Sequence, residues 1–302
     1  MVRKIEFSVS AGEDGMTALD LLRAHGFSRR MVTKLKQTGG LTRGGEVLRS
    51  VDRVSEGDTV CVVMEDSADI APNADISAPI SYEDDDIIVF DKPPFLPVHQ
   101  SIRHYGDTLA NLFAALHPDL PFRPINRLDK NTSGLCVCAK NRFAAASVSD
   151  SVSKVYFAAV DGIITEAGRI DIPIDRESDS IIKRCVSPTG KRAVTNYEPI
   201  LCACGRTLLR ITLETGRTHQ IRAQFASRGL PLLGDGKYGS HSKLPNIALW
   251  AVRLTVPHPT DGHPVCATCL PTGEPWSRFD LPKGQMQNPK NTPNDSVTEP
   301  LI

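Results

Sequence analysis

Short apolar runs recur from about residue 80 to residue 282, and this pattern most constrains the fold. Each run is bounded by charged or turn-forming residues, which is typical of β-strands. The runs are DDIIVFDKP, GLCVCAK, KVYFAAVDG, TLLRITLET and ALWAVRLTV. Helices are expected near 107–116, 141–150 and 218–228. This order predicts an α+β domain over 80–282 with a mixed or antiparallel central sheet.

Residues 1–64 predict a second, smaller α+β domain. MVRKIEFSVS alternates like a strand, and apolar residues recur near helical spacing over 16–36. Glycine turns and short β-type runs then lead to a strand at 59–64, so we expect two helices followed by a hairpin. The segment 65–79 is acidic and contains proline, which predicts a linker. The tail 283–302 has no aromatic residue and is predicted to be disordered.

The formal net charge of the 302 residues is zero, but the charges are unevenly distributed. Eight basic residues lie between 21 and 53 against Glu46 and Asp52, a net charge of +6. Eight acidic residues and no basic one lie between 65 and 86. The basic block can meet phosphates, or it can be a solvated helix face. Charge alone leaves both readings open.

The chain has eight cysteines, which raises the question of a zinc site. Cys202 and Cys204 form CxC, and Cys266 and Cys269 form CxxC within PVCATCL, which resembles a strand. A structural zinc site typically has its ligand pairs in tight turns, so we favour buried, reduced thiols and expect no metal. The N-terminus lacks the apolar run of a signal peptide, and no apolar stretch is long enough to span a bilayer. We therefore expect a protein of the cytoplasm or another reducing compartment, without a membrane partner.

Residues 124–141, PINRLDKNTSGLCVCAKN, place one acidic residue between two cations in a loop. Asp129 is preceded by Arg127 and followed by Lys130, and the neighbouring positive charges favour the charged form of its carboxylate. A surface ion pair explains this pattern as well as a reactive site does.

Two later segments add an aromatic residue and a group of polar and cationic residues at a helix N-terminus. In KVYFAAVDG, alternation places Lys154 and Tyr156 on the same face, where Tyr156 is either a core residue or a plate for stacking a base. In LETGRTHQIRAQFASRGLPLLGDGKYG, Arg217, Thr218, His219 and Gln220 crowd a helix N-terminus, which favours a phosphate. Arg222 lies beside the apolar face of that helix, and a buried arginine there needs a carboxylate or phosphate partner.

Together and in this order, the segments resemble the RluA family of pseudouridine synthases. RLDKNTSGL is similar to the family's catalytic loop, KVYFAAVDG to its tyrosine strand, and GRTHQIRAQFASRGLPLLGDGKYG to its third signature. DKPPFLPVH is similar to its opening strand and loop. The resemblance covers roughly 80–282. More weakly, the N-terminal domain resembles the small RNA-binding domain that precedes many such enzymes.

The resemblance implies a role for each matching residue. Asp129 would be the catalytic carboxylate, and Arg222 would pair with it. Tyr156 would pack against the uracil and assist the late proton removal. Arg127 would take the place of the flipped base, and Ile221 would form part of the apolar wall.

One position departs from the family pattern. The family commonly has His before Arg-Leu-Asp, whereas this chain has Asn126, which cannot carry a charge. We expect Asn126, Arg217, His219 and Gln220 to belong to the RNA-binding surface.

The resemblance implies isomerisation of uridine in ribosomal or transfer RNA by a monomer, without cofactor or metal. The reaction breaks a glycosidic bond, turns the ring and rejoins it, so neither redox chemistry nor a phosphate donor is required. Two alternatives come from other classes. One is a non-catalytic RNA-binding protein with the same fold, which would be expected to lack Asp129 or Arg222. The other is a zinc-dependent nucleic-acid enzyme, but the deaminase signature is missing.

Overall fold

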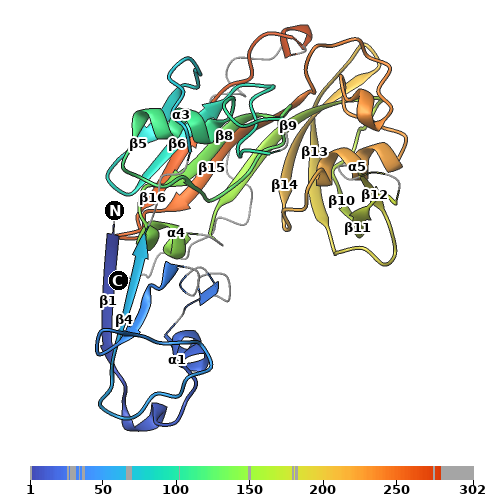
Figure 1. Ribbon diagram of the computed structural model, residues 1–302. Coiled ribbons are helices and arrows are strands. Elements are labelled where there is room, and N and C mark those ends of the chain that lie inside the picture. Colours follow the sequence, from blue (N-terminus) through green and yellow to red (C-terminus); the bar gives the residue numbers. More distant parts are fainter. Residues whose placement is uncertain are drawn as a thin grey trace, which may run out of the picture. The chain divides into compact units, whose positions relative to one another are not determined.

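The computed structural model describes residues 2–279, apart from 26, 28–31, 34, 36–37, 66–69, 102, 149–150, 179, 181–182 and 275. The chain divides into two compact units (Figure 1). The first comprises residues 1–69 together with 119–121, and the second comprises 70–118 and 122–302. The expected linker and domain boundaries stay predictions, and the tail 283–302 lies outside the described residues.

The first unit packs a short helix on a four-stranded sheet of order β1-β4-β2-β3. Its elements are β1 (Val2–Ser8), a 3₁₀ turn η1 (Ala11–Glu13), α1 (Ala18–Ala24), β2 (Leu41–Arg43), β3 (Glu46–Val47) and β4 (Thr59–Glu65). Thr17 caps α1 by accepting a hydrogen bond from the Asp20 N–H at 3.2 Å. Leu21 and Leu22 of α1 share a buried core with Val60 and Val62 of β4. The expected first strand, first helix and hairpin are present, whereas the second expected helix falls largely outside the described residues.

The second unit is built on a ten-stranded sheet with a main path of order β10-β13-β14-β9-β15-β8-β6-β5. Its strands are β5 (Ile80–Glu83), β6 (Ile87–Lys92), β7 (Arg123–Pro124), β8 (Ser133–Ala139), β9 (Ser153–Asp161), β10 (Gly168–Asp171), β11 (Ile174–Arg176), β12 (Arg184–Val186), β13 (Val194–Ala203), β14 (Arg206–Leu213), β15 (Leu249–Pro257) and β16 (Pro264–Thr268). Its helices are α3 (Leu109–Leu116), α4 (Arg142–Val148) and α5 (Gln220–Ser227), with 3₁₀ turns η2 (Gly236–Tyr238) and η3 (Trp276–Arg278). The three helices lie where the sequence predicts them.

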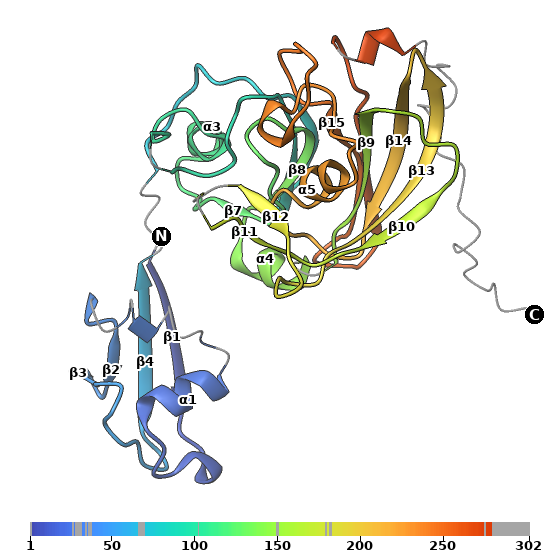
Figure 2. The same ribbon diagram turned by 90° about the vertical axis from the view of Figure 1, so that its right-hand side faces the viewer.

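The sheet is mixed, because β15 pairs with β8 in parallel and with β9 and β16 antiparallel. β7 pairs with β8 beside the main path, and β11 and β12 form a separate two-stranded ribbon. Figure 2 shows β9, β14, β13 and β10 in succession, with α5 near β11 and β12. The predicted α+β class with a mixed central sheet is confirmed.

Strand β8 is buried at all seven positions because both faces of the sheet are covered there. Leu135, Val137 and Ala139 pack with α4 and β6, while Cys136 and Cys138 alternate with them along the strand. Gly134 has φ 107°, and a side chain there would collide with the backbone of Ala251 on β15. The glycine in RLDKNTSGL therefore allows the parallel contact between β8 and β15.

Candidate active site

Asp129 lies in the loop between β7 and β8, and buried bonds on both sides fix this loop. The buried amide of Asn126 donates to the Leu135 carbonyl at 3.2 Å and accepts the Val137 N–H at 2.7 Å. The Thr132 N–H closes a turn on the Asp129 carbonyl at 3.0 Å. Because the Asn126 amide is engaged by β8, its bonds favour a positioning role, and its contact with RNA stays a prediction.

Lys92, at the end of β6, also holds this loop, although the sequence analysis did not single it out. Its fully buried ammonium donates to the carbonyls of Pro93 and Leu96 at 2.9 Å and of Lys130 at 3.2 Å. Burial lowers the pKa of Lys92 to about 8, while three carbonyl acceptors satisfy the ammonium hydrogens. In the sequence, Lys92 could have been noticed in the segment DKPP, because this lysine directly follows the apolar run of a strand.

Arg222 on α5 bridges Asp129 to a second carboxylate. Its Nη1 donates to Asp129 Oδ2 at 3.1 Å, as the resemblance implies. Its Nε and Nη2 donate to the two oxygens of Asp235 at 2.6 and 2.9 Å. Asp235 is 1% exposed, so sequence reasoning missed a buried partner in LLGDGKYG, where an aspartate between glycines resembles an ordinary turn residue.

This cluster favours a permanent positive charge beside Asp129. Burial opposes that charge, but the hydrogen bonds and negative charges of Asp235 and Asp129 outweigh it and raise the pKa of Arg222. The guanidinium also lies 4.9 Å from the ring centre of Tyr238, a cation–π contact. Because its bonds to Asp235 and its contact with Tyr238 fix the Arg222 side chain, the guanidinium holds Asp129 in one position.

His219 is a buried, neutral member of the same cluster. It caps α5 in the left-handed conformation with φ 55°. Burial lowers the pKa of His219 to about 4. The Tyr238 hydroxyl accepts the Arg184 N–H and can donate to His219 Nδ1 at 2.9 Å. The imidazole hydrogen is then on Nε2, which faces Asp129 Oδ2 at 3.6 Å.

Asp129 opens onto a cavity of about 60 Å³ with aliphatic and aromatic walls. Tyr156 from β9, Leu213 from β14, Leu249 from β15 and Ile221 from α5 line it. Burial and the nearby negative charge of Asp129 raise the pKa of Tyr156, so its hydroxyl keeps its proton at neutral pH. Lys154 and Tyr156 both line the adjoining groove, as their predicted shared face requires.

Cationic grooves flank this cavity. One groove, of about 470 Å³, shares Asp129 and Tyr156 with the cavity and is also lined by Arg127, Arg217 and Lys130. A second, of about 420 Å³, contains Arg176, Arg184, Lys191 and Arg217 against Asp175. Such surfaces attract the phosphates of a nucleic acid without regard to sequence.

The structure gives Gln220, predicted to bind substrate, a buried structural position. Its side-chain oxygen accepts from the Thr215 hydroxyl and the Arg217 N–H, and its nitrogen donates to the Val194 carbonyl and Thr195 hydroxyl. These bonds join α5 to β13, so Gln220 supports the turn that carries Arg217 and His219. Its contact with RNA stays a prediction.

The cysteines are free thiols, but the expectation that they are buried is only partly correct. Cys136 and Cys138 are buried, whereas Cys202, Cys204 and Cys266 are exposed. The burial of β16 alternates, so one face of PVCATCL meets solvent although the segment reads as apolar. Within the described ranges, the group of at least three metal-ligand side chains contains no cysteine. No helix in that part of the chain is long and apolar enough to span a membrane.

The arrangement suits chemistry on a flat ring presented by a larger anionic molecule. A carboxylate is held beside a guanidinium, next to a cavity with an aromatic wall and between cationic grooves. Such a carboxylate can act as nucleophile or base, and the walls can hold a ring that has left its neighbours.

Comparison with known proteins agrees with this chemistry. The sequence profile of the RNA pseudouridylate synthase family matches residues 86–227. The ribosomal large subunit pseudouridine synthase D of Pseudomonas aeruginosa is 38% identical over 249 residues, covering 78% of each chain. That of Xanthomonas campestris is 35% identical over 268 residues, covering 80% of this chain and 81% of the relative. The solved structure of human RNA pseudouridylate synthase domain containing 1 matches with a TM-score of 0.55 and 25% identity, over 66% of this chain and 86% of that one.

Proposed function

The chain belongs to the RNA pseudouridylate synthase family and isomerises uridine to pseudouridine in RNA, and we propose that its substrate is a uridine in large-subunit ribosomal RNA. The two named bacterial relatives carry that substrate in their names, and they match most of this chain. We further propose that it works as a monomer in the cytoplasm. Size-exclusion chromatography with light scattering tests the oligomeric state, and a stable dimer would contradict it.

We propose Asp129 as the catalytic carboxylate, and its contact with Arg222 beside the cavity carries this assignment. Breaking the bond between N1 of uracil and C1′ of ribose leaves an electron-poor sugar and a detached base. A fixed carboxylate can act on the sugar as nucleophile or remove a proton as base. Arg222 and Asp235 position it, so that little reorganisation is needed during the reaction.

The remaining residues have proposed roles in holding the uridine outside its stack. The target base leaves the RNA stack to reach the cavity. Tyr156 and Ile221 then contact the ring, and the Tyr156 hydroxyl assists proton transfer from C5; its position in the cavity wall supports this role. The exposed Arg127, at the edge of the cavity, fills the vacated space in the RNA, while Arg217 meets phosphates in both grooves.

Mapping pseudouridine in cellular RNA tests the substrate and the catalytic residue together. Cells with the gene, without it, and with Asp129→Asn in its place are compared. Modification of one or a few large-subunit uridines should disappear with the gene and return with the wild type only. Loss confined to transfer RNA would contradict the ribosomal substrate, whereas restoration by Asp129→Asn would contradict the role of Asp129.

We propose that the basic block of the first unit adds affinity for RNA. Arg43, Arg49 and Arg53 already bond within the unit, to Asp58, Asp52 and the Gly15 carbonyl. The contribution therefore rests on the exposed Arg23 and on four residues outside the described ranges, Arg29, Arg30, Lys34 and Lys36.

Glutamine at all five of these positions in the full-length chain should flatten the salt dependence of RNA binding. Each lost phosphate contact lowers the log–log slope by about 0.7–0.9. Arg49→Gln, at a side chain that is 78% exposed and paired within its unit, is the matched control. An unchanged slope in the fivefold variant would mean that the block is a solvated face.

A further inference from the structure

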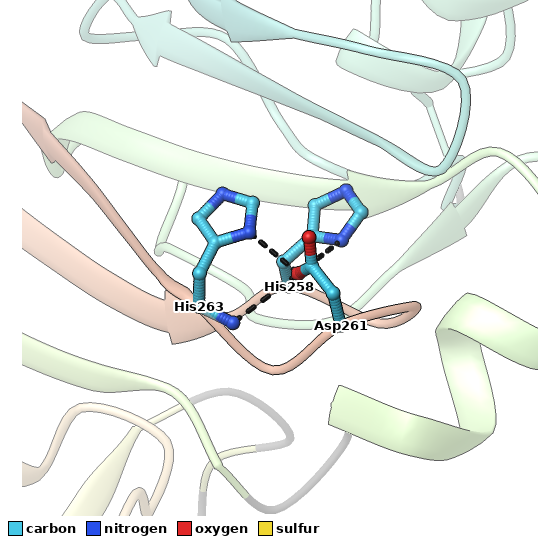
Figure 3. A group of neighbouring side chains, drawn as sticks. All are labelled: His258, Asp261 and His263. Atoms are coloured by element: carbon cyan, nitrogen blue, oxygen red, sulfur yellow. Dashed lines mark hydrogen bonds and ion pairs between the residues drawn. The ribbon is translucent and has the colours of Figure 1, made fainter.

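The turn between β15 and β16 brings together two imidazoles and a carboxylate that the proposed reaction does not use. His258 and His263 stack with ring centres 4.7 Å apart and planes 15° apart. Figure 3 shows the Asp261 carboxylate joined by dashed lines to both rings. Asp261 Oδ1 lies 3.1 Å from His258 Nδ1 and 2.5 Å from His263 Nδ1. The three side chains thus bring two nitrogens and one oxygen close together.

The second nitrogen of His258 faces another carboxylate. His258 Nε2 lies 3.1 Å from Asp84 Oδ2, which also accepts the Tyr82 hydroxyl at 2.6 Å. Asp84 Oδ1 accepts the N–H groups of Asp86 and Ile87 at 2.8 and 2.7 Å. Asp84 thus accepts three hydrogen bonds and is held in place facing His258 Nε2.

A neutral His258 cannot satisfy both carboxylates, because a neutral imidazole carries a single N–H. If Nε2–H donates to Asp84, His258 Nδ1 accepts the Thr260 N–H at 3.3 Å, but it also lies 3.1 Å from Asp261 Oδ1, so two acceptors are close together. A second proton on His258 or a cation bound by both atoms would relieve this repulsion. A metal-bound histidine usually donates its other N–H to a carboxylate, which is the arrangement that Asp84 provides.

We propose that this turn binds a divalent transition-metal ion, such as zinc, nickel or cobalt, through His258 Nδ1, Asp261 Oδ1 and His263 Nδ1. The ligand atoms already lie within 4.8 Å of one another. Metal–ligand distances of about 2.0–2.2 Å require only a small movement of the exposed Asp261 and His263. Two imidazoles and one carboxylate suit these metals and leave positions open for water.

The location indicates a structural role. β15 has nine residues and begins at Leu249, which lines the cavity. At about 3.3 Å per residue, the turn lies roughly 26 Å from that end of the strand. His258 bonds to Asp84, and Thr260 donates to Asp86 Oδ2 at 2.6 Å. The ion would therefore join the β15–β16 hairpin to the turn between β5 and β6 without touching Asp129.

Calorimetric titration of the tag-free, full-length chain with nickel or zinc chloride at pH 7.5, after dialysis against chelator, tests the site. One ion should bind per chain in the micromolar range, and saturating metal should raise Tm by about 5 °C. Cobalt should give no thiolate charge-transfer absorption, since the ligands are nitrogen and oxygen. The rate of pseudouridine formation should not change with metal.

Substitutions separate this site from binding elsewhere. His263→Ala and Asp261→Asn should each abolish binding of the ion and the accompanying Tm shift. Both side chains are more than half exposed, so the fold should persist in these variants. Asp84→Asn should weaken binding about 10–100-fold. The exposed His241→Ala and the exposed Cys266→Ser on the same hairpin should bind like the wild type. Absence of binding to the wild type, or binding unaffected by His263→Ala, would overturn the proposal and leave a protonated His258 as the explanation of the geometry.

Discussion

Arg222 and His258 each lie between two aspartates, but their surroundings differ. Arg222 is 5% exposed and joins Asp129 to the fully enclosed Asp235. His258 joins the partly exposed Asp84 to Asp261, which is 60% exposed. An arginine keeps its charge at any physiological pH, whereas a histidine gains or loses it with a proton or a metal. The difference teaches that the proposed catalytic carboxylate is held by a permanent charge, whereas the hairpin turn pairs its aspartates through a side chain that can bind a metal ion.

The largest expected effect comes from removing the negative charge of Asp129, which lies beside Arg222. Asp129→Asn should lower single-turnover pseudouridine formation by about 10³-fold. RNA binding and folding should persist, because Arg222 keeps both bonds to Asp235. The exposed Asp161→Asn is the control and should retain the wild-type rate. A rate within tenfold of the wild type for Asp129→Asn would remove the carboxylate from the chemistry.

The next largest effect is on the free energy of unfolding, and it distinguishes the buried Arg222 cluster from a surface ion pair. Asp235→Asn should lower the free energy of unfolding by about 3 kcal/mol, since it leaves the buried Arg222 with one carboxylate. Glu214→Gln, which removes the exposed partner of Arg169, should lower the free energy of unfolding much less, because solvent screens that pair. Urea denaturation of the two variants measures both values, and equal losses would mean that Asp235 matters no more than a surface pair.

A smaller effect depends on His219, the histidine of the buried cluster. Its folded-state pKa of about 4 lies below the ordinary 6.5. The unfolded chain therefore binds the proton more readily, and stability falls as pH decreases from about 7 toward 4. At pH 5 the loss attributable to His219 is about 2 kcal/mol relative to pH 7.5. His219→Gln should remove that part of the loss in urea denaturation at the two pH values, and an unchanged pH dependence would show that other groups cause it.

The smallest effect is expected at the hairpin turn without metal. Asp261→Asn should leave the free energy of unfolding of the chelated protein almost unchanged, because the side chain is exposed. The same variant should differ clearly from the wild type only when metal is added. A loss as large as that of Asp235→Asn in the absence of metal would break the contrast between the two clusters.

The sequence predicted the main strands well, because their apolar runs and alternation are local properties. The runs around β6, β8, β9, β14 and β15 lie on strands, and the mixed sheet was within the expected class. The ten-residue β13 was not anticipated, because its sequence VTNYEPILCA includes a proline and several polar residues. The short strands β10, β11 and β12 were not anticipated either, because each has only three or four residues and little apolar pattern. The exposed Cys202, Cys204 and Cys266 show the same limit, since an apolar-looking run does not tell which face the sheet covers.

The site was predictable only through the resemblance of its motifs to those of a known family, because residue spacing does not show which distant residues meet. Asp129 and Arg222 are 93 residues apart, and their contact depends on a loop and a helix meeting across the sheet. Asp235, Lys92 and Tyr238 bond to these elements, but nothing local distinguishes them from a turn aspartate, a strand-end lysine or a core tyrosine. The histidines of the β15–β16 turn were also missed, because the cysteine pairs are the more conspicuous metal-binding pattern in the sequence.

The sequence by itself determined the strand-forming runs, the helices near 107–116, 141–150 and 218–228, and the motif that carries Asp129. These follow from periodicity and residue type, which act over a few neighbours. Only the tertiary structure decided that Arg222 is shared between Asp129 and Asp235, and that His258 lies between Asp84 and Asp261. Sheet order and burial set those distances, because a buried charge is stable only where the fold brings its partner from a distant segment.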